Sequence, residues 1–273
     1  MKRFLDDVGN ATALALIALA VGLLVVPLLA SVVMSFDARS YLGPFPPKSF
    51  STRWYVEFAN NDFYLSGIKT SLVLAVIVAV VSTAVGVSAA LVFDRYRFPG
   101  KELLLAFFLS PLVAPGVVVG FGLLMFFSLM GVFDGFPRLV GGHIIMTIPY
   151  TIRTTLAGLV GIKKSLTEAA LSLGANERQA FWNITFPLAQ TGMAAGAVFA
   201  FAVSMEDTSV SMFLTDAKTL TLPVAMISMM RANFDLSIAA CSVLLTGMTF
   251  AIILILDRSF GLEKVIGQGM YRS

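Results

Sequence analysis

Cysteine, histidine and charge are all scarce in this sequence. The single cysteine, Cys241, lies in an apolar run, so the chain has neither a disulfide framework nor a cysteine-rich metal site. The single histidine, His143, is expected to be a packed or interfacial side chain, because a metal site needs several donors close together. Charged residues make up only 13% of the chain and form no run of one sign, which argues against a nucleic-acid partner.

Apolar residues dominate instead. They account for 58% of the 273 residues, and the mean hydropathy of +0.87 is far higher than a soluble domain needs for its core. A helix needs about 20 apolar residues to cross a bilayer core of roughly 30 Å. We therefore predict an all-α, polytopic membrane protein, a single transmembrane domain over residues 1–273 with six spans at about residues 11–35, 66–93, 102–130, 139–160, 191–214 and 236–256.

Two of these segments have special features. The first follows Lys2 and Arg3 as in a signal peptide, but its apolar part is too long for a cleaved leader, so a retained anchor is expected. The third contains Pro111 and Pro115, each of which removes a backbone donor. We expect this helix to be kinked.

The distribution of basic residues predicts the orientation. One set of connections carries Lys2, Arg3, Arg95, Arg97, Lys101, Lys163, Lys164, Arg178, Arg258, Lys264 and Arg272. The other set carries fewer: Arg39, Lys48, Arg53, Arg138, Lys218 and Arg231. Because cytoplasmic loops are enriched in Lys and Arg, both termini are predicted to be cytoplasmic. Three connections then face outward: Asp37 to Leu65, the turn "GVFDGFPR" and Thr215 to Asp235.

One polar stretch, "EAALSLGANERQAFWNITFP", interrupts the apolar chain on the predicted cytoplasmic side. Ser165 precedes Glu168 by three residues, the spacing of a reciprocal cap at a helix start. Gly174 is expected to end this helix, because glycine adopts the left-handed conformation without steric cost.

A second short helix is expected directly afterwards. Asn176 and Gln179 have the spacing of a cap, and Pro187 is expected to end the helix, which completes a compact elbow over residues 165–187. Its apolar residues are numerous for a free loop and must be covered either by the chain's own helices or by a partner: Leu166, Ala169, Ala170, Leu173, Phe181, Trp182 and Ile184.

The same stretch resembles the EAA signature of binding-protein-dependent ABC importer permeases, written E-A-A-x(3)-G-x(9)-I-x-L-P. The matching residues are Glu168, Ala169, Ala170, Gly174, Ile184 and Pro187, and only Phe186 departs, where the pattern has leucine. Within that family the chain is most similar to the second permease subunit of spermidine/putrescine transporters, through "DRYRFPGK", "SMEDTSVSMFLT" and "TLPVAMISMMR".

This resemblance implies a type I ABC importer permease in the bacterial inner membrane. The elbow would be the coupling helix that docks on a separate ATPase, present in two copies, which binds the ATP and Mg²⁺; no cofactor is expected in this chain. A homologous permease subunit would complete a heterodimer, and a solute-binding protein would dock on the outer loops. A polyamine is the favoured solute, while 2-aminoethylphosphonate, another small amine and ferric iron remain open.

Two adjacent carboxylates, Glu206 and Asp207, lie inside the predicted fifth span, where ionisable groups are costly and often functional. A continuous helix would place Ser204, Asp207, Thr208 and Ser211 on one polar stripe, and Glu206 among apolar neighbours. Asp207 is therefore the candidate counter-charge for a cationic solute. Alternatively, both carboxylates accept hydrogen bonds at a helix contact. Arg153 in the fourth span is too far along the bilayer normal to pair with them directly.

An enzyme is not expected, because the sequence has no phosphate loop of the GxxxxGK[ST] type, no metal constellation and no nucleophile beside a base. An ion-coupled secondary transporter is the alternative from another class, since it too would have several spans and buried carboxylates. Such transporters usually contain two related halves, and neither the elbow nor the acidic pair is repeated.

Overall fold

The computed structural model describes residues 2–41, 43–232 and 235–260, and the chain divides into two compact units. One consists of Met1–Tyr64 with Met226–Gly247, and the other of Leu65–Ala225 with Met248–Ser273. In the described residues all regular elements are helices, apart from one isolated bridge between Asp37 and Phe50. The all-α class is confirmed.

The first unit contains α1 (Lys2–Ser35), α2 (Arg53–Ala59) and parts of α11 (Leu222–Ala232) and α12 (Ser237–Phe260). Its small core gathers around Trp54, whose indole Nε1–H donates to the Asp37 carbonyl at 2.8 Å. The buried partners of Trp54 come from distant parts of the chain: Leu236 and Ala240. The apolar window of α1 has no residue buried within the chain, as expected of a helix whose surroundings are lipid or other subunits.

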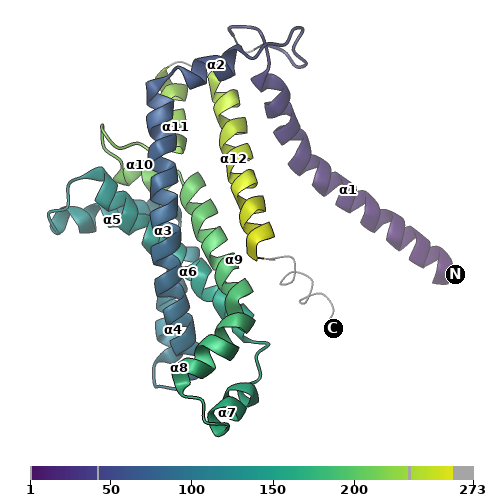
Figure 1. The fold of residues 1–273 in the computed structure, drawn as a ribbon. Helices are drawn as coiled ribbons and strands as arrows, with labels where there is room; N and C mark the ends of the chain where they lie inside the picture. The colour runs from purple at the N-terminus through teal and green to yellow at the C-terminus, as the bar shows by residue number, and fades with distance from the viewer. Residues whose placement is uncertain (1, 42, 233–234, 261–273) are drawn as a thin grey trace. The chain divides into compact units, whose positions relative to one another are not determined.

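The second unit is built on three long helices, α3 (Asp62–Arg95), α6 (Gly135–Leu159) and α9 (Phe186–Glu206), of which α6 and α9 make the most extensive contact (Figure 1). The two helices lie close together because glycines of one helix face the backbone of the other. A Cβ on Gly192 would lie 2.7 Å from the Thr154 carbonyl oxygen and 2.9 Å from the Gly158 Cα. The absence of side chains here lets the two helices approach at backbone distance.

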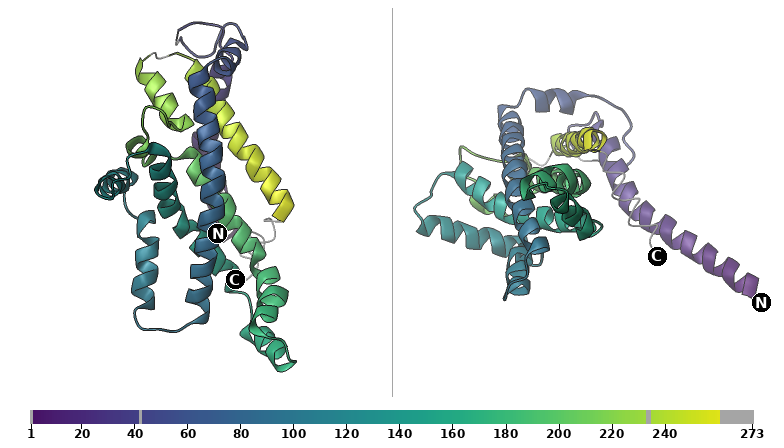
Figure 2. Two further views of the ribbon diagram at one scale, coloured as in Figure 1. Left: turned by 60° about the vertical axis from the view of Figure 1, so that its left-hand side comes forward. Right: turned by 60° about the horizontal axis from the view of Figure 1, so that its bottom comes forward.

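The third predicted span is not one helix. It consists of α4 (Lys101–Leu109), a 3₁₀ turn (Ser110–Leu112) and α5 (Gly116–Leu129). The chain bends by 105° between the two helical parts. Figure 2 shows α4 returning alongside α3 and α5 turning away from it. The break falls at Pro111 and Pro115, as expected, but it is a sharp bend rather than a kink.

Among the described residues, four helices have the length and hydropathy of membrane spans: Thr12–Ser35, Asp62–Arg95, Glu177–Glu206 and Ser237–Ile255; the bent pair is a fifth if it counts as one span. The predicted fourth span corresponds to α6, which does not meet that criterion. Buried polar residues follow one another along it, at His143, Thr147, Thr151 and Thr155. The number six stays a prediction.

Candidate functional site

The elbow begins with α7 (Lys164–Ser172), which ends as the sequence predicts. Gly174 has φ +93°, in the left-handed region. The Ala175 N–H donates to the Ala170 carbonyl and the Gly174 N–H donates to the Leu171 carbonyl, both at 3.0 Å, which is the double hydrogen bond of a Schellman motif. The glycine therefore fixes the angle at which the chain leaves α7.

The second part of the elbow, α8 (Glu177–Ala180), starts with a complete capping box. The Gln179 N–H donates to the Asn176 side chain, and the Asn176 N–H donates to the Gln179 side chain, each at 2.9 Å. These two bonds satisfy backbone donors that a helix start otherwise leaves free. The predicted cap at Asn176 is present.

Two other local predictions about the elbow were wrong. Helix α7 starts at Lys164, with Lys163 as its N-cap and no side-chain cap, so Ser165 and Glu168 do not form one. Pro187 does not end the second helix. A π-helical turn at Phe181–Thr185, closed by the Phe186 N–H donating to the Phe181 carbonyl, leads into α9, and Pro187 lies in the first turn of α9, where its missing N–H is tolerated. The segment Glu177–Glu206 is consequently a single 30-residue helix.

Glu168 is exposed and borders a recess of about 180 Å³ between the elbow and the adjacent ends of α3 and α6. The recess has apolar walls and a charged rim, formed by Leu91, Asp94, Arg95, Leu159, Ile162, Thr167, Glu168 and Thr185. At its edge the Arg95 guanidinium lies 4.0 Å from the Glu177 carboxylate. Both groups are solvent-accessible, so this pair holds the elbow only weakly.

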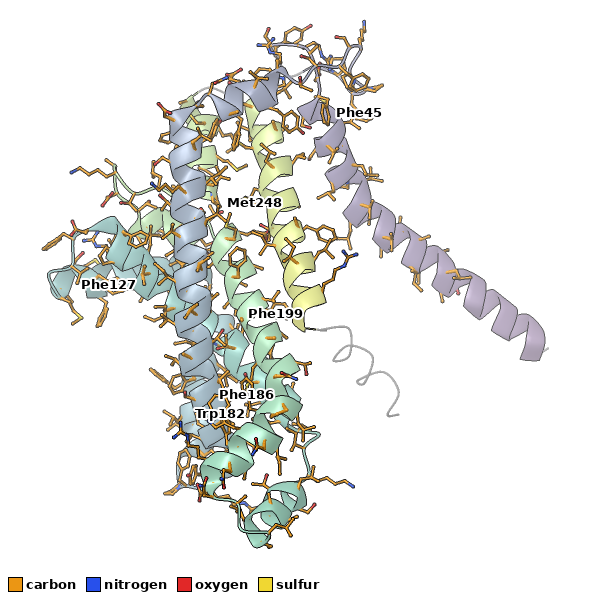
Figure 3. All side chains as sticks on the ribbon, in the orientation of Figure 1. Phe45, Phe127, Trp182, Phe186, Phe199 and Met248 are labelled. Atoms are coloured by element: carbon orange, nitrogen blue, oxygen red, sulfur yellow. The ribbon has the colours of Figure 1, made fainter. Side chains whose placement is uncertain are left out.

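The chain's own helices cover the elbow only in part. Ala180 and Thr185 are buried and Ile184 is half-buried, whereas Leu173 is 90% exposed and Trp182 is 52% exposed. Figure 3 shows Trp182 and Phe186 close together where the π-helical turn leads into α9. Their ring centroids are 5.0 Å apart. A segment with large apolar side chains left uncovered has the character of a protein-binding surface.

At its C-terminal end, α9 stops at Glu206. The prediction of a continuous helix to Leu214, with one polar stripe along it, was therefore wrong. Asp207 has extended backbone angles (φ −64°, ψ 129°) and precedes a separate short helix, α10 (Ser211–Leu214). Its carboxylate Oδ2 accepts hydrogen bonds from the backbone N–H of Val210 at 3.1 Å and of Ser211 at 2.8 Å. Asp207 thus accepts two backbone donors at the start of α10, and side-chain acceptors of this kind stabilise a helix start.

Arg153 is exposed and forms no ion pair with Asp207 among the described residues. The neighbour of the Asp207 carboxylate is the imidazole of His143 on α6, which is 2% exposed and whose Nε2 lies 3.8 Å from Asp207 Oδ2. The imidazole also contacts Ser204 of α9 and Ser211 of α10, each at 2.9 Å. The expectation of a packed histidine holds, but its contacts were missed. The available signal was the row of polar residues four apart along α6.

The environments of the two carboxylates are therefore the reverse of the prediction, which made Asp207 the accessible counter-charge and placed Glu206 among apolar neighbours. The Asp207 side chain is 14% exposed and engaged within the chain, whereas Glu206 is exposed. Within the described residues, the Glu206 carboxylate makes no hydrogen bond or ion pair. Of the remaining stripe residues, Ser204 and Ser211 are buried and Thr208 is half-buried.

The fold and the elbow together define a class of protein, the ABC importer permease. Over 93% of both chains the structure superposes, with a TM-score of 0.73 and 16% identity, on a chain of a bacterial alginate ABC transporter solved in complex with an alginate pentasaccharide-bound periplasmic protein. An identity this low supports only the fold.

The family follows from the sequence comparison. Residues 82–262 match the model of the binding-protein-dependent transport system inner membrane component, and the chain belongs to this family. It is 31% identical to the spermidine/putrescine permease protein PotC of Shigella flexneri over 246 residues, 90% of this chain and 92% of that one. It is 29% identical to the putrescine permease protein PotI of Escherichia coli strain K12 over 81% of this chain and 80% of that one. A transport permease is not an enzyme, and an ion-coupled carrier is ruled out by this membership.

Proposed function

We propose that this chain is the permease subunit of an importer for a polyamine such as spermidine or putrescine. The names of PotC and PotI support this solute. The observation that carries the proposal is the exposed face of α9, where the Glu206 carboxylate lies seven residues, or two helical turns, after Phe199.

That face suits a flexible chain of ammonium groups. The Glu206 carboxylate attracts a cation, and an aromatic face attracts one as well. Phe199 is 51% exposed and stacks on Tyr150 of α6 with ring centroids 6.3 Å apart, so its position is fixed (Figure 3). A charged group and an aromatic group at separate heights on one helix match a solute whose charges are separated by methylene groups.

The elbow supplies the coupling in this proposal. Its uncovered side chains, Leu173 and Trp182, fit a groove on a separate ATPase that binds the ATP and Mg²⁺. Because Glu177–Glu206 is one helix, a displacement of the elbow moves the Glu206 end with it. Two ATPase copies, a second permease subunit and an extracytoplasmic solute-binding protein complete the transporter. The basic residues of the elbow side favour an inner-membrane orientation with both termini in the cytoplasm.

The test is transport by the assembled complex. The chain is co-expressed with the second permease, the ATPase and the binding protein of its transporter, purified and reconstituted into proteoliposomes. We expect the ATPase to copurify, and ATP-dependent uptake of labelled spermidine or putrescine when the binding protein is present. Uptake of 2-aminoethylphosphonate or ferric iron, without polyamine uptake, would reject the proposed solute. Purification of an active, ATP-independent carrier would reject the proposed assembly.

A further inference from the structure

Four side chains from three helices form one directional series of hydrogen bonds at the end of α9. The Ser211 hydroxyl donates to Asp207 Oδ2 at 3.1 Å, because an ionised carboxylate can only accept. The Ser211 oxygen then accepts from His143 Nε2–H, and the other ring nitrogen, Nδ1, accepts from the Ser204 hydroxyl. Each group in the series Ser204, His143, Ser211 and Asp207 thus has a defined role.

The far end of this series is anchored in the apolar core. Val210 and Leu214 of the α10 segment are fully buried against Leu74, Val78 and Leu139 of α3 and α6. The hydrogen-bond series consequently ties the end of α9 to the buried α10 segment. The turn 207–210 connects Glu206, the last residue of α9, to α10.

We propose that His143 is a positioning residue that sets the exposure of the Glu206 carboxylate. By holding Ser204 on one side and Ser211 on the other, the imidazole keeps Asp207 over the start of α10. Asp207 in that place ends α9 directly after Glu206. Were α9 to continue helically through Asp207, Ser209 and Val210 would follow Glu206 at i+3 and i+4 on the same helix face and lie beside its carboxylate. The inference rests on the proposed function only for the contact between Glu206 and solute.

An imidazole suits this position for a geometric reason. Its two nitrogens lie on opposite sides of a rigid ring, so it bridges two hydroxyls that belong to different helices. The amide of a glutamine can replace the Nε2–H donor of the imidazole, but it then has no acceptor at the position of Nδ1. Since Ser204 and Ser211 are buried, any hydroxyl that loses its partner there is costly.

The direct test measures the accessibility of position 206 in the purified, membrane-reconstituted complex. In a background with Cys241→Ala, Glu206→Cys is labelled with a water-soluble cationic methanethiosulfonate reagent. Adding His143→Phe should change the labelling rate by about tenfold, the population shift expected when buried hydrogen bonds are lost. The matched control is Thr151→Val, which removes a buried hydroxyl of the same helix that bonds to the Ser82 carbonyl at 2.9 Å. The control should leave the labelling rate within about twofold.

Graded variants separate positioning from a general loss of structure. His143→Gln, which keeps one of the two bonds, should give a smaller change than His143→Phe. Ser204→Ala removes only the Nδ1 partner, and it decides the matter if His143→Phe does not assemble. The same three variants, His143→Phe, His143→Gln and Ser204→Ala, are also made in the chain that keeps Glu206. There they should raise the half-saturating concentration of solute-loaded binding protein more than they lower the maximal uptake rate.

The outcomes are distinguishable. Unchanged labelling of position 206 in both His143→Phe and Ser204→Ala would overturn the positioning role. Equal changes in the Thr151→Val control would also overturn it, because any buried polar loss would then suffice. Altered labelling without any polyamine uptake by the unmodified complex would leave the positioning role standing and reject the proposed function.

Discussion

The two carboxylates at the end of α9 are neighbours in the chain and differ in what they contact. Asp207 accepts bonds from two backbone N–H groups and one hydroxyl, which compensates its charge inside the protein. Glu206 has no such bonds within the described residues and is exposed. A charge that is already compensated contributes little to the capture of a cation, so we assign the proposed role in transport to Glu206.

We predict unequal effects of neutralising these two residues. Glu206→Gln should lower the initial rate of polyamine uptake by about tenfold, the factor that corresponds to roughly 1.4 kcal/mol, and leave assembly intact. Asp207→Asn should instead lower the thermal unfolding midpoint of the purified subunit, because an amide caps α10 less well than a carboxylate. Uptake rates and unfolding midpoints are measured in parallel on the same preparations. Full transport by Glu206→Gln would remove the proposed counter-charge.

A third carboxylate, Asp216, lies in the connection after α10 and organises it. The Gly135 N–H donates to Asp216 Oδ2 at 2.7 Å, and the Lys218 and Thr219 N–H groups donate to Oδ1. These donors, that of Gly135 above all, hold the pKa of the Asp216 carboxyl below its usual value. The carboxylate thereby joins its own loop to the first residue of α6.

The lowered pKa predicts a pH dependence with a definite sign. The stabilisation by Asp216 is fully present above the unfolded pKa of about 3.9 and is lost as the pH falls through the lower folded pKa. Asp216→Asn should therefore lower the unfolding midpoint at pH 7, and the difference from the unmodified protein should shrink below about pH 4. Thermal unfolding in detergent across this range checks it. A difference that stays constant with pH would show that the charge of Asp216 is not involved.

At the scale of elements, the elbow depends on one backbone conformation. The Schellman bonds at the end of α7 and the capping box at the start of α8 meet across the two residues Gly174 and Ala175. With so short a connection, the angle between the helices is determined almost entirely by the left-handed conformation at Gly174.

Gly174→Val should impose a strain of roughly 1–3 kcal/mol, because a β-branched residue tolerates positive φ poorly. We expect reduced copurification of the ATPase, with membrane insertion unaffected. Gly161→Val is the control, since Gly161 borders the same elbow, has open space around its α-carbon and does not have a positive φ. Normal copurification with the Gly174 variant, or equal losses in both, would mean that this hinge angle does not govern docking.

At the scale of the whole molecule, one helix, Glu177–Glu206, connects the elbow, which we propose to dock on the ATPase, to the Glu206 carboxylate, which we propose to meet the solute. α9 cannot slide freely on α6, because their glycines are in backbone contact around Gly158 and Gly192. Motion imposed on the elbow is therefore expected to move α6 and α9 together. Glu168, at the rim of the recess between the elbow and the ends of α3 and α6, lies where that motion would enter.

Glu168→Ala should weaken ATPase association or uncouple ATP hydrolysis from transport by about tenfold, as expected for a central interface residue. Since Glu168 does not cap α7, the folding of the elbow should be unaffected. The measurement compares uptake with binding-protein-stimulated ATP hydrolysis in vesicles, and Glu102→Ala, which removes an exposed carboxylate in the first turn of α4, serves as the control. Wild-type values for both activities in the Glu168 variant would contradict the coupling role.

Local chemistry was sufficient for much of this protein. Long apolar runs determine the membrane class, because no soluble core requires them. Gly174 and the pair Asn176 and Gln179 specify their own backbone hydrogen bonds within a few residues, so the sequence correctly predicts the end of α7 and the start of α8. The signature beginning at Glu168 indicates the family, and the match over residues 82–262 confirms it.

Only the tertiary structure decided where α9 ends and which carboxylate is exposed. The sequence of residues 204–211 is compatible both with a continuous helix and with a helix that ends at Glu206, and we predicted the continuous helix. The break after Glu206 is stabilised by Asp207 bonding to α10, by His143 reaching Ser204 and Ser211 from α6, and by Val210 packing on α3 and α6. These partners lie 61 to 68 residues from His143 in the chain, and contacts over such separations follow from packing rather than from local spacing.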